Sequence, residues 1–375
     1  MYYNTKYVGL DVSKNKIAVA VAEEGRSKAR YVGMIDYTVE AIRKCIKKLG
    51  ELDQLHFCYE AGPTGYELCR LLISMDVTCE VVAPSLIPQK PGSRIKTDKR
   101  DALNLATLLR AGELTPIHVP TEDDEALRDL VRAREDVKED ELRAKHRLTK
   151  LLLRHDIREP VGIKKWTLKY WEWLHQLTFS RSASRTAFQE YVQQLREYQH
   201  RLKRLEEVIK EEAEHGVHAP LIQKLMTLRG IAILTATSLV AEVSTFDRFI
   251  HPSGFMSYTG LVPSEGSSGI TRKQGAITKT GNRHIRRLLI EAAWSYRHQP
   301  RIGRELARRQ RGHSSELLRI SWQAQHRLHK KYYRLIARGK ESGKAITAVA
   351  RELAGFVWAV AREPDGTKNE AVLER

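Results

Sequence analysis

The chain is poor in cysteine and contains no long apolar segment. Only four of its 375 residues are cysteines, at positions 45, 58, 69 and 79, and none belongs to a Cys-x-x-Cys pair. This spacing argues against a zinc site and against a disulfide framework. Each cysteine is expected to be a small buried hydrophobe in a reducing cytosol. No run of about 18 apolar residues occurs, and the first residues lack a signal-peptide core, so neither a membrane span nor secretion is expected.

Acidic residues become scarce toward the C-terminal end. Between Val262 and Lys344 there are 20 Lys or Arg residues and 5 Glu but no Asp, so this stretch contributes +15 of the formal net charge of +18. A charge so concentrated favours a polyanionic partner, most often nucleic acid. Ribosomal and membrane-surface proteins share such a balance, so charge alone leaves those classes open.

The length is compatible with two or three domains, and residues 1–118 predict the first of them. Apolar runs at 7–10, 17–21, 55–59 and 77–83 indicate strands, and residues 30–34 fit a further strand. Helices are expected at 39–49 and after the Gly62–Gly65 break. A polar turn joins the first two strands as a hairpin, and the later alternation of strands and helices indicates an α/β domain with parallel strands.

The remainder of the chain predicts helices. Residues 119–215 form a connector, with a charged helix over 122–155 followed by a heptad stripe. The stripe consists of Phe188, Tyr191, Leu195, Tyr198, Leu202, Leu205 and Ile209. Such spacing is typical of a coiled coil, and it fits pairing with 122–155 and pairing between chains equally well. Residues 216–345 are expected to form a basic, mainly helical domain, and residues 346–375 a C-terminal helix and tail.

Four acidic residues stand where a metal site could be built. Asp11 ends the first strand, Glu60 ends a later one, and Asp98 and Asp101 share one face at the start of a helix. Active-site groups in parallel sheets gather at the carboxyl ends of the strands, and carboxylate oxygens suit Mg²⁺ or Mn²⁺. Each acid also fits a structural role on its own, because Asp11 can shape a turn and Asp98 with Asp101 can form a capping box.

A glycine- and serine-rich segment runs from Gly254 to Gly281, and a helix capped by Asn282 is expected to follow it to about His298. On composition alone this segment is best explained as a flexible linker. The helix start offers free backbone N–H groups and a positive dipole end to a phosphate. The basic residues expected to contact nucleic acid are Arg272, Lys273, Lys279, Arg283, Arg286 and Arg287.

Two sets of motifs resemble one known family. VGLDVSKNKIAVAV, CYEAGPTGY and KTDKRDALNLA are similar to the three motifs of the DEDD transposases of the IS-one-ten insertion-sequence family, whose RuvC-like N-terminal domain has an RNase H-like fold. GLVPSEGSSG followed by GAITKTGNRHIRRLL resembles the signature of that family's C-terminal serine transposase domain. The resemblance covers residues 6–112 and about 221–297. The turn at 228–231 lacks the Pro and the second Gly of the family's P-G-I-G motif, so no phosphate contact is expected there.

The resemblance implies a function and a set of site residues. The family's acids fall on Asp11, Glu60, Asp98 and Asp101 as ligands of Mg²⁺ or Mn²⁺, and its nucleophile falls on Ser268, beside Ser267. It implies a DNA recombinase that joins donor and target DNA through a phosphoserine, guided by a structured bridge RNA. The alternatives are a RuvC-like metal-dependent junction nuclease and a non-catalytic nucleic-acid-binding protein.

The resemblance also implies an assembly and a location. It implies a homo-oligomer, a tetramer, in which the acids of one subunit face the serine of another. The location expected is the cytoplasm of a bacterium or archaeon, in association with the nucleoid.

Overall fold

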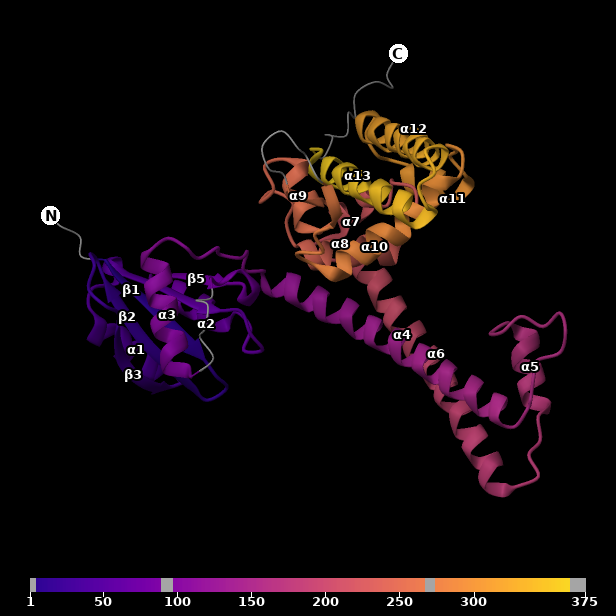
Figure 1. The fold of residues 1–375 in the computed structure, drawn as a ribbon, viewed down its shortest axis with the longest axis horizontal. Coiled ribbons are helices and arrows are strands. Elements are labelled where there is room, and N and C mark those ends of the chain that lie inside the picture. The colour runs from indigo at the N-terminus through magenta and orange to yellow at the C-terminus, as the bar shows by residue number, and fades with distance from the viewer. Residues whose placement is uncertain (1–4, 89–96, 267–273, 365–375) are drawn as a thin grey trace, which may run out of the picture. The chain divides into compact units, whose positions relative to one another are not determined.

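The computed structural model describes residues 5–88, 97–266 and 274–364, and the chain divides into two compact units, Met1–Thr121 and Glu122–Arg375 (Figure 1). Each unit has its own apolar core. None of the described helices is both long enough and apolar enough to span a membrane.

The first unit is an α/β domain built on a mixed five-stranded sheet in the order β3-β2-β1-β4-β5. β1 and β2 pair antiparallel, as do β2 and β3, whereas β4 and β5 continue from β1 in parallel. The expected hairpin and parallel strands are both confirmed. The strands are β1 (Lys6–Val12), β2 (Lys16–Glu23), β3 (Arg30–Asp36), β4 (Leu55–Glu60) and β5 (Thr78–Val82).

The two faces of this sheet bury side chains of different size. Large residues such as Leu10, Val19 and Phe57 pack against α1 (Val39–Leu49) and α2 (Glu67–Ile73) on one face. Small residues line the other face: Gly9, Ala18, Ala20 and Ala22. They leave room for α3 (Asp98–Arg110), whose Ala102 and Ala106 pack on the alanines. Gly9 is required, because a Cβ there would lie 2.3 Å from the Ala102 carbonyl oxygen.

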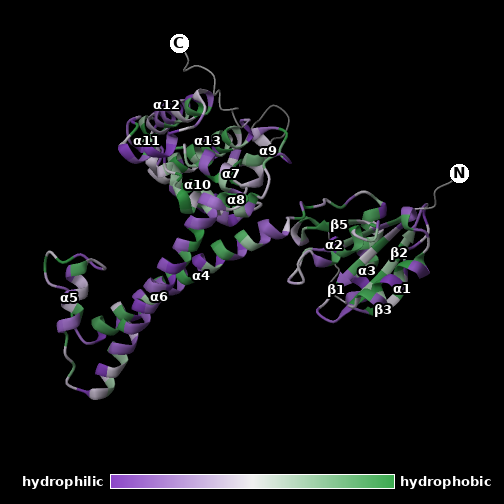
Figure 2. Ribbon diagram, turned by 180° about the vertical axis from the view of Figure 1, so that it is seen from behind, coloured by the Kyte–Doolittle hydropathy of each residue, from purple (hydrophilic) through white to green (hydrophobic). Residues whose placement is uncertain are grey.

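The second unit begins with two long helices, α4 (Glu122–Arg154) and α6 (Ser182–His215), which pack against each other. Along both, hydrophobic residues recur between hydrophilic ones (Figure 2). Phe188 and Leu195 of the heptad stripe are buried against α4 and α5 (Leu168–Gln176), and Ile209 joins a core that includes the start of α4. The heptad stripe fitted pairing with residues 122–155 and pairing between chains equally well, and the structure contains the pairing with residues 122–155.

The rest of the second unit is a helical body with one small strand pair. Its buried centre is α13, where Val349, Leu353 and Val357 are fully enclosed, and α13 packs against α9, α10 and α12. The helices are α7 (Ala219–Leu225), α8 (Ile233–Val243), α9 (Pro252–Tyr258), α10 (Arg283–Ala293), α11 (Arg304–Gln310), α12 (Ser315–Ala337) and α13 (Ser342–Arg362). The mainly helical character expected for this part of the chain is confirmed.

The described flanks of the glycine- and serine-rich segment form regular structure. On either side of residues 267–273, the strands β6 (Pro263–Glu265) and β7 (Gln274–Ile277) pair antiparallel. The expectation of a flexible loop is thus wrong for these flanks. Composition did not predict these strands, because such short strands pair through backbone hydrogen bonds and show little hydrophobic periodicity.

Candidate functional site

Asp11 and Glu60 lie at the carboxyl ends of neighbouring parallel strands. Leu10 of β1 pairs in register with Tyr59 of β4, so the acid that follows each of them stands at the same level. Leu10 and Tyr59 are buried on the face covered by α1 and α2. Because side chains alternate along a strand, Asp11 and Glu60 point to the opposite face, the one covered by α3. Both are half-buried.

The first turn of α3 is brought to the same end of the sheet. In the last turn, Arg110 donates from Nη1 to the carbonyl of Glu23 over 3.0 Å, and Glu23 pairs with Lys6 at the start of β1. The helix therefore runs antiparallel to β1. Its beginning, with Asp98 and Asp101, lies at the end where β1 reaches Asp11.

Two contacts fix this first turn. The Thr97 hydroxyl accepts from the backbone N–H of Arg100 over 3.4 Å, so Thr97 is the N-cap, where the sequence suggested Asp98. Lys99 places its ammonium 5.3 Å from the centre of the Tyr31 ring, a cation–π contact to β3. The capping-box interpretation of Asp98 is therefore wrong, and both acids lie in the first helical turn.

The four carboxylates form an oxygen-rich end of the sheet but not a closed metal site. Among the residues that the structure describes, no group of three or more His, Cys, Asp or Glu side chains is placed to hold a metal ion. Asp98 is exposed and Asp101 is half-buried, so both remain accessible to solvent. The donor chemistry of the four carboxylates fits a hard divalent cation.

The predicted nucleophile lies outside the described part of the chain. Ser267, Ser268, Arg272 and Lys273 all fall in residues 267–273, which the structure does not describe. The residues around them are described in detail, and they form a backbone framework that joins β6 and β7 to α9 and α10.

Two glycines let this framework pack directly on α9. Gly260 and Gly281 both have positive φ, 65° and 88°. A Cβ at Gly281 would lie 2.0 Å from the Tyr258 carbonyl oxygen, and one at Gly260 would lie 2.2 Å from that of Thr280. No other residue type fits either position without displacing backbone. Backbone N–H groups of Thr278 and Lys279 then donate to the carbonyls of Val262 and Gly260.

A buried carboxylate that the sequence analysis missed holds the start of α10. Glu242 of α8, with 2% of its side chain exposed, accepts from Arg132 Nε over 2.9 Å and from Asn282 Nδ2 over 2.7 Å. Burial alone would raise the pKa of Glu242, but the hydrogen bonds from Arg132 and Asn282 outweigh it and hold that pKa below its usual value. The only signal in the sequence is a single acid within the apolar run ILTATSLVAEV.

Asn282, which donates to Glu242, is also the N-cap residue of α10. Its Oδ1 accepts from the backbone N–H groups of His284 and Ile285 over 2.8 and 3.1 Å, which confirms the expected cap. The expectation that these N–H groups are free for a phosphate is wrong, because the cap uses them. Burial lowers the pKa of the His284 imidazole, although the charge of Glu242 acts in the opposite direction.

The described cations of this segment divide into two pairs. Arg286 donates from Nη1 to the Thr259 carbonyl over 2.9 Å, and Arg287 pairs with Glu135 at 2.6 Å and with Glu291 at 3.0 Å. These two guanidinium groups therefore support the fold. Lys279 and Arg283 are exposed, so they are the described cations of this set that are best placed to meet a phosphate.

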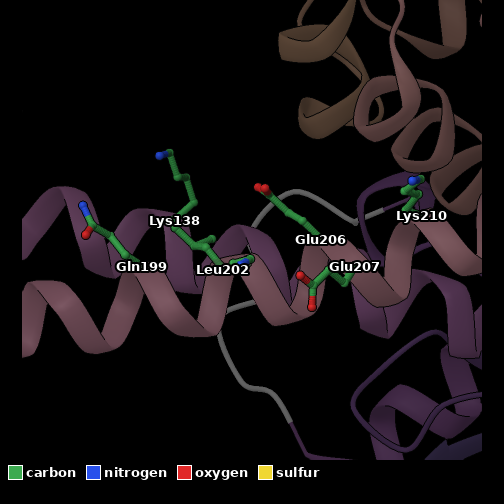
Figure 3. A pocket seen from close by; sticks show the side chains of 7 residues that line it. Lys138, Gln199, Leu202, Glu206, Glu207 and Lys210 are labelled. Atoms are coloured by element: carbon green, nitrogen blue, oxygen red, sulfur yellow. The ribbon is translucent and has the colours of Figure 1, made fainter. Parts of the chain in front are cut away.

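A hollow of about 430 Å³ lies along α4 and α6, in a different part of the second unit (Figure 3). Its lining mixes opposite charges and contains no Ser, Cys or His: Lys138, Gln199, Leu202, Lys203, Glu206, Glu207 and Lys210. It offers no serine or cysteine nucleophile, and the described residues form no group of metal ligands there, so it is not part of the candidate site.

Comparison with known proteins finds family models that match both the carboxylate region and the region around the serine segment. Residues 8–156 match a family model described as Transposase, of the DEDD IS110 type. Residues 222–308 match one described as Transposase IS116/IS110/IS902 family. The chain is 46% identical over 363 residues to a putative transposase, y4qE, of Sinorhizobium fredii, covering 96% of this chain and 90% of that one. It is 34% identical over 343 residues to the transposase for insertion sequence element IS1533 of Leptospira borgpetersenii, covering 89% and 98%.

Proposed function

The chain belongs to the IS110 family of transposases, and we propose that it exchanges DNA strands through a phosphoserine formed on Ser268. One observation supports the proposal above all. Asp11, Glu60, Asp98 and Asp101 come from three separate elements, and the fold brings them to one end of one sheet face. A purely structural role for each acid does not require that convergence.

We propose that the first unit is an RNase H-like, RuvC-like domain. The support is its topology, in which β1 is central, two antiparallel strands lie on one side and two parallel strands on the other. A helix crosses β1 over a glycine and delivers acids to the carboxyl ends of β1 and β4.

The four carboxylates would hold Mg²⁺ or Mn²⁺. When bound, such an ion stabilises charge on the phosphate and on the attacking and leaving oxygens. The protein contributes the placement of its ligands: β1 and β4 fix Asp11 and Glu60, while Thr97 and Lys99 fix the first turn of α3. Four carboxylates in one site would repel one another unless a cation neutralised them.

The serine would conserve bond energy during exchange. As the Ser268 Oγ–phosphorus bond forms, the phosphorus–oxygen bond to the departing strand breaks, and the proton of Oγ leaves to solvent while the departing oxygen takes one up. A new strand end reverses the same step, so no phosphodiester is lost to water. Lys279 and Arg283, which are exposed, would balance charge on the phosphate, and Gly260 and Gly281 fix the backbone on either side of the segment.

We also propose the partners that the family implies, a structured guide RNA and donor and target DNA, in a homotetramer. The basic stretch from Val262 to Lys344 supports a nucleic-acid partner. Beside the buried row of the heptad stripe, Tyr191, Tyr198 and Leu205 remain only partly buried. Tyr191 and Tyr198 also pack against the core shared with α4 and α5, and the parts of this second row that remain exposed would contact another chain.

The direct test is cleavage of labelled junction DNA in Mg²⁺. We expect covalent protein–DNA products from the wild-type chain, and none from Asp11→Asn or after chelation. The matched control is Asp53→Asn, an exposed acid just before β4 begins and thus at the opposite end of that strand. Free DNA ends without adducts would instead indicate a junction nuclease, and binding without cleavage a regulatory protein. Cleavage by Asp11→Asn would refute the carboxylate site.

A further inference from the structure

One face of α12 presents aromatic and basic side chains in a single row. Arg319, Trp322, His326, Lys330 and Tyr333 are spaced at intervals of three and four residues, so they project from the same side of the helix. We call these five residues the α12 stripe. At 1.5 Å per residue the row is about 21 Å long. Figure 1 shows α12 on the outside of the helical body, beside α11 and α13.

The rings of this row are unusually exposed. Trp322 is 40% exposed and Tyr333 is 52% exposed. The opposite side of the helix is buried, with Leu317, Ala324 and Leu328 in the core, so packing inside the unit is already provided without the two rings. Both rings therefore present apolar surface whose burial against a ligand would be favourable.

Neighbouring histidines hold both rings. The Trp322 and His326 ring centres are 4.5 Å apart at an angle of 77°, and those of His329 and Tyr333 are 4.7 Å apart at 62°. His329 is itself fixed by a 3.2 Å contact from Nδ1 to the Tyr296 carbonyl. Such edge contacts restrict each ring to one orientation. When a ligand stacks on such a ring, the protein side chain therefore loses less conformational entropy.

The charge around the rings selects the ligand. Between Ser315 and Lys340 there are seven Lys or Arg residues and one Glu. That Glu, Glu316, pairs with Arg319, whereas Lys330 and Arg334 are exposed with no ion pair among the described residues. A second copy of the chain docked through this same surface would bring the same positive row against it. A polyanion with flat rings matches both the charge and the aromatic side chains.

We propose that the α12 stripe is a stacking platform for unpaired bases of a single-stranded nucleic acid. In a duplex the base faces are covered by their neighbours, so only unpaired bases can stack on Trp322 and Tyr333. Lys330, between the two rings, would meet the phosphates. This surface lies outside the four carboxylates and Ser268, and it rests on the proposed function only in that the chain acts on nucleic acid.

The test compares strands that differ only in their bases. The full chain is titrated with labelled oligo(dT), oligo(rU) and an abasic oligonucleotide of equal length. We expect Trp322→Ala combined with Tyr333→Ala to weaken binding to the base-bearing strand by roughly tenfold or more, the scale of one lost stacking contact. Binding to the abasic strand should be unchanged. Lys330→Ala should weaken both strands equally, and Gln323→Ala, on an exposed neighbouring residue, should weaken neither.

Three results would overturn the platform. The first is equal binding of base-bearing strands by the wild type and the double variant. The second is a loss that is the same for the abasic strand. The third is a lower molecular mass of the double variant in light scattering with unchanged affinity, which would assign the rings to contacts between chains. Base-dependent binding of either oligo(dT) or oligo(rU) supports the proposal, and the strand that binds more tightly shows whether DNA or RNA is preferred. Asp11-dependent cleavage, measured separately, tests the proposed function itself, because α12 carries none of the proposed catalytic residues.

Discussion

Replacing Glu242 by Gln should destabilise the second unit although the shape of the side chain is kept. The carboxylate accepts two hydrogen bonds from Arg132 and one from Asn282, and hydrogen bonds to charged groups contribute about 1.5–3 kcal/mol each. A Gln side chain has one acceptor oxygen, and its NH₂ group would face another donor. The Arg132 side chain is 57% exposed, so water replaces part of what it loses. We expect a loss of about 2–3 kcal/mol in the free energy of unfolding.

Urea unfolding followed by tryptophan fluorescence measures this loss of stability in the second unit alone. All six tryptophans lie within residues 122–375, so the signal does not come from the first unit. The matched control is Glu291→Gln, which removes a carboxylate that is 59% exposed and pairs with Arg287, and it should change stability by less than about 0.5 kcal/mol. Equal stability of Glu242→Gln and the wild type would refute the role assigned to the buried carboxylate.

The same residue predicts a pH dependence with a definite sign. Because the pKa of Glu242 is lowered in the folded protein, its contribution is present above the unfolded value of about 4.3 and is lost as pH falls through the folded value. The stability difference between the wild type and Glu242→Gln should therefore shrink as pH falls below about 4. His284, whose pKa is also lowered, is present in both proteins, and the comparison reduces its contribution. A difference that grows on acidification would contradict the assignment.

Three further predictions follow from backbone, surface and charge. Gly281→Ala should lower the free energy of unfolding by about 3 kcal/mol, because Ala is strained at φ 88° and would contact the Tyr258 carbonyl. The control is Gly312→Ala, at φ 79° in open space, which should lower it by about 1 kcal/mol in the same urea assay. Tyr191→Glu with Tyr198→Glu should lower the mass measured by light scattering while the helical content is kept, and an unchanged mass would exclude this row as the interface. Affinity for nucleic acid should fall steeply with salt, and an affinity that salt does not alter would contradict phosphate binding by residues 262–344.

Much of the first unit could be predicted because its strands are short apolar runs that end at polar turns. The approach of Asp11 to Glu60 followed from one rule, that parallel strands end at the same edge of a sheet. The direction of α3 could not be predicted, since it depends on Arg110 reaching the carbonyl of Glu23, 87 residues earlier in the chain. Local sequence predicts where an acid sits on an element, and tertiary contacts decide which edge that element faces.

The second unit shows where local patterns are insufficient. The stripe from Phe188 to Ile209 predicts an apolar seam but not its partner, because α4 and another chain would present the same complementary surface. Glu242 was missed for a similar reason. Its partners, Arg132 and Asn282, are 110 and 40 residues away in sequence, and nothing near Glu242 indicates that it holds the N-cap residue of another helix.

The central claim is that Ser268 becomes covalently attached to DNA. The most direct measurement is a denaturing gel of labelled DNA incubated in Mg²⁺ with the wild-type chain, Ser268→Ala and Ser267→Ala. We predict a protein–DNA adduct with the wild type and with Ser267→Ala, and none with Ser268→Ala, which should still bind DNA. An adduct from Ser268→Ala but not from Ser267→Ala would move the nucleophile by one residue. Normal recombination by the variant lacking both serines would contradict the serine mechanism.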